Sequence, residues 1–131
     1  MNAALADAAQ ALVGTPFLLH GRDPATGVDC VGLVLAAMAT SGRVAQVPTN
    51  YGLANRSVDA VLPFAEQGGW HLCEGPARPG DLVLTRPGPA RFHLLIARDE
   101  SSFIHADAAL GRVVRIAAPL RWPIIRHWRL S

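Results

Sequence analysis

Lysine is absent from the sequence, and all twelve of its basic residues are arginine. A Schiff-base enzyme, a pyridoxal-phosphate enzyme and a P-loop nucleotidase each need a lysine amine, so these three classes are excluded. The formal net charge is only +2, and the arginines are scattered rather than clustered, which argues against nucleic acid as a partner. Arginine does suit bidentate binding of carboxylate groups.

Long apolar runs and cysteines are also scarce. No stretch approaches the roughly 18 unbroken apolar residues of a membrane span, so no membrane partner is expected. The first residues carry Asp7, no Lys or Arg, and alanines in place of a leucine-rich core. They do not read as a signal peptide, and we expect a protein that is cytoplasmic as synthesised. Without a secretion signal, Cys30 and Cys73 are expected to be free thiols.

Length and periodicity predict one α+β domain over residues 1–131. Half of the residues are apolar and 17% are charged, which is typical of a chain that folds alone. Apolar spacing predicts helices over residues 3–13, 30–41 and 57–67, and Gly and Pro residues predict a long ordered loop over 14–29. From Pro79 onward, five short β-rich runs predict a largely antiparallel sheet. These runs are DLVLTR, RFHLLIAR, SSFIHA, RVVRIA and IIRHWR.

Cys30 falls at the predicted N-terminus of the second helix. Unpaired backbone amides and the positive end of the helix dipole stabilise a thiolate at such a position. We therefore expect a depressed pKa for Cys30 and an ordinary pKa, near about 8.5, for Cys73. The alternative interpretation is that Cys30 is an inert buried side chain, because cysteine also serves as a small hydrophobe.

Two histidines are candidates for the base that a nucleophilic thiol requires. His93 and His105 lie twelve positions apart across the polar turn Asp99-Glu100-Ser101. A hairpin with an odd loop centred on Asp99 would place the two imidazoles opposite each other on one face, whereas an even loop would separate them. On one face, one ring could pair with the thiol while the other fixes its tautomer. Otherwise both histidines simply fill half-exposed strand positions.

Three separated segments resemble the NlpC-type cell-wall peptidases. Gly14-Thr15-Pro16-Phe17 and Asp29-Cys30-Val31-Gly32-Leu33-Val34 are similar to the Gly-x-Pro-Tyr loop and the nucleophile motif of that family. Pro79-Gly80-Asp81-Leu82-Val83 matches its strand before the histidine. His93-Leu-Leu-Ile-Ala and Phe103-Ile104-His105-Ala106 are similar to its two histidine blocks, with the same interval. The resemblance covers roughly residues 10–110.

This resemblance implies a papain-like fold, with N-terminal helices packed on a sheet of about five strands. It also implies a Cys-His-His triad that hydrolyses amide bonds in peptidoglycan stem peptides, commonly between D-glutamate and diaminopimelate. By this carry-over, Cys30 is the nucleophile, His93 is the base and His105 orients that base. No cofactor and no metal are implied.

The substrate pocket departs from the family pattern at two positions. Phe17 replaces a tyrosine and Val31 replaces a serine, so we expect these residues, with Asp29 as a partner for the amine of the stem, to shape substrate binding. A bare catalytic domain also resembles the phage and prophage branch, which implies phage tail proteins as further partners and delivery to the wall in a particle.

Two alternatives from other classes stay open. One is a catalytically silent phage tail assembly module with the same fold. The other is a metal site made by Cys30, His93 and His105, since the same side chains can bind zinc with an open fourth position. His71 and Cys73 form a further short-spaced pair, but no second such pair accompanies it, so we expect an ordinary half-buried thiol there. His127 is expected to be a plain strand residue.

Overall fold

The computed structural model describes residues 2–42, 69–88 and 91–130. Helices α1 (Asn2–Ala11) and α2 (Cys30–Thr40) confirm the first two predicted helices, while the predicted helix over residues 57–67 lies outside the described residues. The strands are β1 (Arg22–Asp23), β2 (Gly27–Val28), β3 (Trp70–Leu72), β4 (Leu82–Gly88), β5 (Arg91–Asp99), β6 (Ser102–Asp107), β7 (Arg112–Ala117) and β8 (Ile124–Leu130). Neither described helix is long and apolar enough to cross a membrane.

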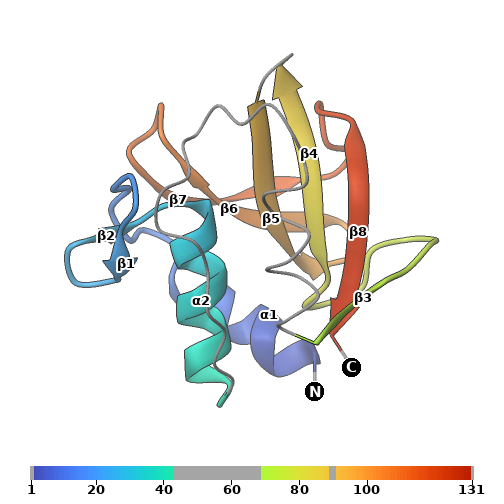
Figure 1. The fold of residues 1–131 in the computed structure, drawn as a ribbon, viewed down its shortest axis with the longest axis horizontal. Helices are drawn as coiled ribbons and strands as arrows, with labels where there is room; N and C mark the ends of the chain where they lie inside the picture. Colours follow the sequence, from blue (N-terminus) through green and yellow to red (C-terminus); the bar gives the residue numbers. More distant parts are fainter. Residues whose placement is uncertain (1, 43–68, 89–90, 131) are drawn as a thin grey trace.

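Six strands form one antiparallel sheet in the order β3-β8-β4-β5-β6-β7 (Figure 1). All five predicted strands are present as β4 to β8, because each run has the length and β-branched content that suit a pleated, half-buried surface. The three-residue strand β3 adds an edge that the sequence did not predict. The result is an α+β domain in which the helices come first and the sheet follows.

The segment between the helices is more regular than the predicted loop. Its strands β1 and β2 pair as a small antiparallel hairpin. Asp23 builds the turn, since its carboxylate accepts from the Ala25 amide at 2.9 Å and its carbonyl accepts from the Thr26 amide at 3.0 Å. The long ordered loop predicted over residues 14–29 therefore contains a short hairpin, which these local hydrogen bonds of Asp23 close.

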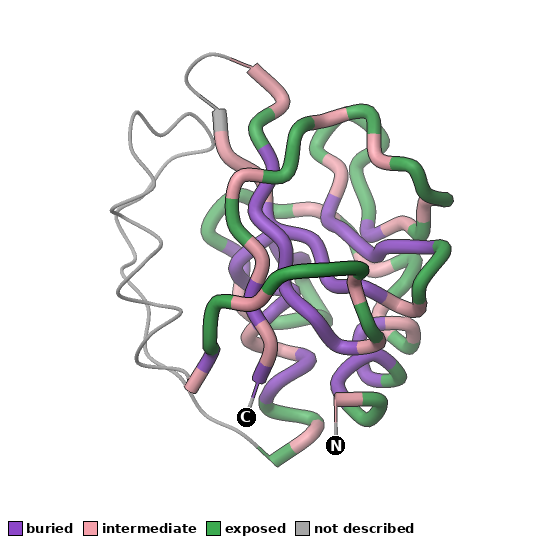
Figure 2. The backbone as a smooth tube through the Cα atoms, turned by 90° about the vertical axis from the view of Figure 1, so that its right-hand side faces the viewer, coloured by how far each residue is buried: buried purple, intermediate pink, exposed green. Residues whose placement is uncertain are grey.

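Apolar side chains cover both faces of the sheet, and buried segments gather at the centre of the molecule (Figure 2). The larger cluster joins α1 and α2 to one face, where Leu33 and Val34 of α2 pack with Leu94 and Ile104. A smaller cluster on the other face includes Leu95 and Phe103, with Trp122 packed against it. Burying each large aliphatic side chain contributes about 1.5–3 kcal/mol, so the helix-covered face supplies most of the stabilisation.

Two glycines let the chain pack tightly around the first turn of α2. A Cβ atom on Gly32 would overlap the carbonyl oxygen of Gly21, and a Cβ on Gly21 would overlap the carbonyl oxygen of Gly27. Glycine is the residue that permits such a close backbone approach. The hairpin is thus locked against the start of α2, which fixes the position of Cys30.

Candidate active site

Asp29 begins α2 as its N-cap. Its carboxylate accepts from the amide of Gly32 at 2.9 Å and from the amide of His20 at 2.8 Å, and it pairs with the Arg22 guanidinium at 3.1 Å. The carboxylate is fully buried. Burial of a charge is tolerated only when the charge is paired and hydrogen-bonded, and these three donors meet that condition. Asp29 therefore anchors the helix start that carries Cys30.

The Cys30 thiol is buried at this helix start, beside strand β5. Burial raises the pKa of the Cys30 thiol to about 11, although backbone hydrogen bonds from Leu94, Val31 and Cys30 itself oppose the shift. These amides must donate to the sulfur, because only a donor stabilises the thiolate. The sequence expectation of a depressed pKa was wrong, since it counted the helix terminus but not the burial of the sulfur against β5.

The pKa expectation for the second thiol was also wrong. Burial raises the pKa of Cys73 above its ordinary value, while Arg129 lowers it and Asp81 raises it. Both thiols are free, as expected. At neutral pH the two cysteines are therefore protonated in this structure.

His93 and His105 meet on neighbouring strands. The β5–β6 register pairs Ile96 with Ile104, so continuing it places His105 opposite Leu95, and His93 one diagonal step away on the same face. Of the two alternatives that the sequence left open, the shared face is the one observed, but the directly opposite placement expected for it was wrong by two residues. The cause is a bulge at Asp99, whose carboxylate accepts from the Ser101 amide at 2.9 Å and moves the turn along the chain.

The two imidazoles form one hydrogen-bonded unit. Nε2 of His93 lies 2.8 Å from Nδ1 of His105, and the ring centroids are 4.9 Å apart at an interplanar angle of 85°. One nitrogen must donate and the other accept, so each ring fixes the tautomer of the other. The backbone of His93 is held in turn, because the Thr85 hydroxyl donates to its carbonyl at 3.1 Å.

Both imidazoles are neutral at physiological pH. Burial and, to a smaller extent, the neighbouring His105 lower the pKa of His93 from 6.5 to about 4, while Asp107 opposes the shift. Burial also lowers the pKa of His105, with Asp107 raising it and Arg121 lowering it. The resting pair thus has an unprotonated nitrogen available at pH 7, which a base requires.

Trp122 packs on both imidazoles. Its ring lies 5.7 Å from the ring of His93 and 5.6 Å from that of His105, edge-on in both cases. The guanidinium of Arg121 stacks on the same indole at 4.9 Å. Nothing in the sequence spacing of Trp122 could reveal the histidines as its neighbours.

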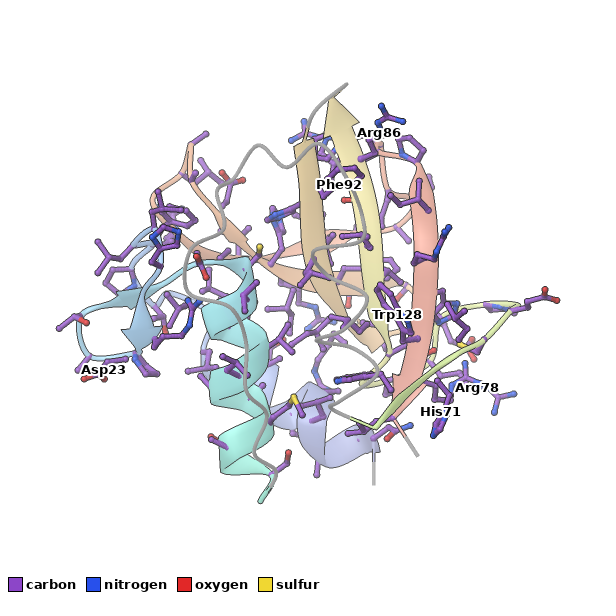
Figure 3. All side chains as sticks on the ribbon, in the orientation of Figure 1. Asp23, His71, Arg78, Arg86, Phe92 and Trp128 are labelled. Atoms are coloured by element: carbon purple, nitrogen blue, oxygen red, sulfur yellow. The ribbon has the colours of Figure 1, made fainter. Side chains whose placement is uncertain are left out.

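A cavity of about 230 Å³ opens beside the histidines. Aromatic side chains form much of its wall, and Figure 3 shows one of them, Phe92, on β5. Asp107 and Arg121 add one charge of each sign to the lining. Among the described residues, Cys30 is not part of this lining.

The predicted substrate residues occupy three different environments. Phe17 lines the cavity beside the histidines. Val31 is buried, and its backbone hydrogen-bonds the Cys30 sulfur. The carboxylate of Asp29 is already engaged by its capping partners, so a role in binding the substrate remains a prediction.

In the structure the two histidines are in direct contact. The Cys30 sulfur contacts the backbone amide of Leu94, the residue after His93 in the sequence. Within the described ranges, the thiol makes no hydrogen bond to the His93 ring. Nor do Cys30, His93 and His105 form a converging set of metal ligands among the described residues. Among the described residues, the potential metal-ligand atoms that do converge belong to Cys73, Asp81 and His127, at a different place in the sheet.

Comparison with known proteins identifies the family. The sequence profile of the NlpC/P60 family matches residues 14–118, whereas no curated protein matches the chain. The fold is similar to NlpC1 from Trichomonas vaginalis (TM-score 0.72, 18% identity, 98% of this chain and 44% of that one). It is also similar to RipB, a peptidoglycan hydrolase from Mycobacterium tuberculosis (TM-score 0.63, 21% identity, 98% of this chain and 64% of that one). A third similar structure is the NlpC/p60 domain of the peptidoglycan hydrolase SagA (TM-score 0.62, 24% identity, 89% of each chain).

This chain spans less than half the length of the Trichomonas protein and under two thirds of RipB. The shared part includes both helices and the sheet, because nearly the whole chain is covered in each case. The profile match extends from Gly14, through the helix that begins at Cys30, to Ala118 beyond strand β7. The chain therefore belongs to the NlpC/P60 family, and its domain has the papain-like α+β fold of that family.

Proposed function

We propose that this protein is a cysteine peptidase that hydrolyses amide bonds in the stem peptides of bacterial peptidoglycan. The observation that carries the proposal is the hydrogen-bonded pair of His93 and His105, in which His93 lies on β5, the strand whose Leu94 amide contacts the buried Cys30 sulfur. Two proteins with the same fold, RipB and SagA, are described as peptidoglycan hydrolases, which favours this substrate class. The bond between γ-D-glutamate and diaminopimelate is the proposed target.

His93 serves as the base in this proposal, and His105 orients it. In the active tautomer, His93 donates its Nε2 proton to Nδ1 of His105, which leaves the Nδ1 lone pair of His93 free. For that lone pair to accept the thiol proton as the sulfur attacks the carbonyl carbon, the thiol and the ring must approach each other, because the resting imidazoles share the Leu95 face of the sheet whereas α2 packs on the Leu94 face. Because the resting thiol and imidazole are both neutral, proton transfer accompanies the attack and no ion pair forms beforehand.

The later steps use the same groups. His93 returns the proton to the leaving amine nitrogen as the C–N bond breaks, and a thioester to Cys30 remains. Water then attacks the thioester, with His93 again as base, and releases the acid and the free thiol. The backbone amide of Cys30, at the positive end of α2, is the proposed donor to the oxyanion in both tetrahedral intermediates.

The cavity beside the histidines is the proposed substrate pocket. Phe17 and Trp122 offer apolar walls, while Arg121 and Asp107 offer charges that suit the carboxylates and amine of a stem peptide. Val31 lies beside the nucleophile in place of the serine in the motif that this segment resembles, so it removes one hydroxyl from this region. Wall stem peptides are thus the proposed partner, and phage tail proteins are a further proposed partner.

The activity should persist well below the ordinary pKa of histidine. A base acts in its neutral form, which exists above its pKa, and burial lowers the pKa of His93 from 6.5 to about 4. As pH falls, kcat/KM should therefore stay high through pH 6 and decline around pH 4. The measurement is kcat/KM for a defined stem peptide between pH 3.5 and 8. An acid limb centred near pH 6.5 would show that His93 is not the titrating base.

A silent assembly module is the second candidate. The observations that favour it are the raised pKa of Cys30 and the missing hydrogen bond between its sulfur and the His93 ring among the described residues. Such a module would keep the fold and lose turnover. Incubation of purified stem peptides with the native protein and with Cys30→Ala separates the two candidates.

A further inference from the structure

A second group of reactive side chains lies on three adjacent strands, away from the histidine pair. Strand β8 runs between β3 and β4, with Leu72 opposite Trp128 on one side and Val83 opposite His127 on the other. The Cys73 amide donates to the His127 carbonyl at 2.9 Å, which extends the first pairing. Cys73 and His127 therefore stand side by side on one face of the sheet, and Asp81 reaches the same point from just before β4.

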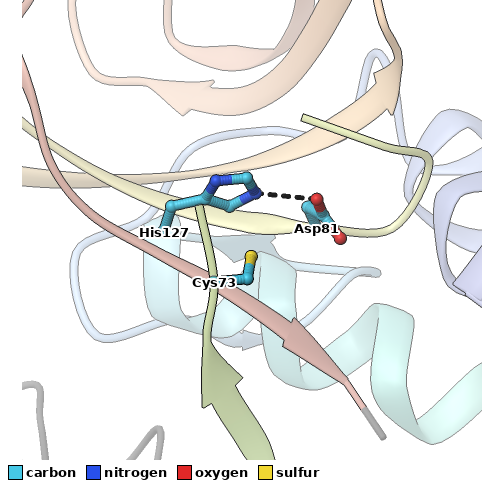
Figure 4. Close-up of side chains that lie close together, drawn as sticks. All are labelled: Cys73, Asp81 and His127. Carbon is cyan, nitrogen blue, oxygen red and sulfur yellow. Dashed lines mark hydrogen bonds and ion pairs between the residues drawn. The ribbon is translucent and has the colours of Figure 1, made fainter. Parts of the chain in front are cut away.

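The ligand atoms of these three residues converge. The Cys73 sulfur, a ring nitrogen of His127 and a carboxylate oxygen of Asp81 all lie within 4.8 Å of one another (Figure 4). Nε2 of His127 lies 2.7 Å from Oδ2 of Asp81. In a tetrahedral zinc site, bonds of about 2.0–2.3 Å separate the ligand atoms by roughly 3.3–3.7 Å, so small side-chain movements suffice.

The group is also accessible. Asp81 is fully buried and the His127 side chain is only 12% exposed, whereas Cys73 is half-buried at the surface. A hollow of about 550 Å³ lies over it, lined by Cys73, Glu74, Arg126 and His127 among others. Figure 3 shows His71 on β3 at this edge, far across the sheet from the start of α2. A small cation can enter here without passing the histidine pair.

We propose that Cys73, His127 and Asp81 form a binding site for zinc or a similar soft divalent metal. Thiolate, imidazole and carboxylate are the ligands that zinc uses in proteins. The open fourth position faces the hollow, where the neighbouring Glu74 carboxylate or a water molecule completes the tetrahedron. Such a metal would join the short edge strand β3 to β8 and β4, and so stabilise this edge of the sheet.

A metal that binds Asp81 must displace some of the hydrogen-bond partners that its carboxylate already has. Arg129 donates from Nε to Oδ1 at 2.9 Å and from Nη2 to Oδ2 at 2.7 Å, and the Arg78 amide donates to Oδ2 at 2.9 Å. A metal at Oδ2 takes the place of the His127 and Nη2 contacts, while the Nε contact keeps the carboxylate paired. On binding, the Cys73 thiol gives its proton to solvent, and the His127 ring binds through Nε2 with its proton on Nδ1.

Cobalt titration tests the site, because thiolate ligation to Co²⁺ gives a charge-transfer absorption band. The protein is purified without a histidine tag and treated with a chelator before Co²⁺ is added, and bound Co²⁺ is then displaced by Zn²⁺. The native protein should bind one equivalent with a thiolate band. The nearly isosteric Cys73→Ser variant should lose the band, and its zinc affinity should fall by more than the roughly 10–100-fold that a lost outer partner costs. His127→Gln should weaken binding similarly.

Two control variants keep the test specific. Cys30→Ser removes the other thiol, and His71→Gln removes an exposed histidine from the same strand edge, so both should bind one equivalent like the native protein. Circular dichroism verifies that Cys73→Ser is folded. No stoichiometric binding by the native protein would overturn the proposal. A thiolate band that survives in Cys73→Ser but disappears in Cys30→Ser would also overturn it.

Discussion

Replacing His93 with alanine should reduce kcat/KM for stem-peptide hydrolysis by roughly 10²–10⁴-fold, the usual contribution of a general base. The neutral Cys30 thiol must lose its proton during the attack, and His93 supplies the unprotonated nitrogen that receives it. Without that nitrogen, only water can take the proton. The expected loss is therefore in kcat as well as in kcat/KM.

His105→Ala should be milder than His93→Ala. His105 holds the ring of His93 through the 2.8 Å hydrogen bond and does not itself exchange a proton with substrate, so measurable turnover should remain. His71→Ala is a matched control, since it removes an exposed histidine from strand β3. Thermal unfolding of each variant checks the fold. A folded His105→Ala that is as inactive as His93→Ala would reverse the assigned roles.

Iodoacetamide should label Cys30 in the native protein at least about 100-fold more slowly than in the unfolded chain at neutral pH. Only the thiolate reacts, and raising the pKa from 9.0 to about 11 lowers the thiolate fraction by roughly that factor. Burial of the sulfur slows the reagent further. Cys73, which is half-buried, should be labelled first, the reverse of the order that the helix-terminus argument predicts.

Peptide mapping of each cysteine over time gives both rates in one sample. The control is the same measurement in denaturant, where the two thiols should react alike. Labelling of native Cys30 ahead of Cys73 near pH 6 would contradict the resting state described above and would indicate a preformed thiolate. Slow labelling of native Cys30 in a preparation that still hydrolyses stem peptides would show that the Cys30 thiol loses its proton only when substrate is bound.

The sequence predicted the elements well because their signals are local. The helix at Cys30 and strands β4 to β8 each follow from a short apolar pattern within one segment. The shared face of His93 and His105 was one of two alternatives that strand parity left open. The position of the turn could not be predicted from the sequence, because the bulge at Asp99 depends on side-chain hydrogen bonds that a period-two pattern does not reveal.

The features that the sequence missed depend on contacts between distant segments. The burial that raises the pKa of Cys30 is completed by β5, which lies about sixty residues further along the chain. Trp122 meets the histidines from a third segment. The pairing of Cys73 with His127 requires β8 to lie beside β3, and no spacing rule in a single sequence gives that order.

The central claim is that Cys30 is the nucleophile of a stem-peptide hydrolase. Mass spectrometry of purified stem peptides, incubated with native protein and with Cys30→Ala, tests this claim directly. The native protein should produce two fragments whose masses sum to the mass of the intact peptide plus one water, with the new ends at the γ-D-glutamyl bond, and Cys30→Ala should produce none. Intact peptides after incubation with well-folded native protein, across several stem types, or equal cleavage by Cys30→Ala, would contradict the account.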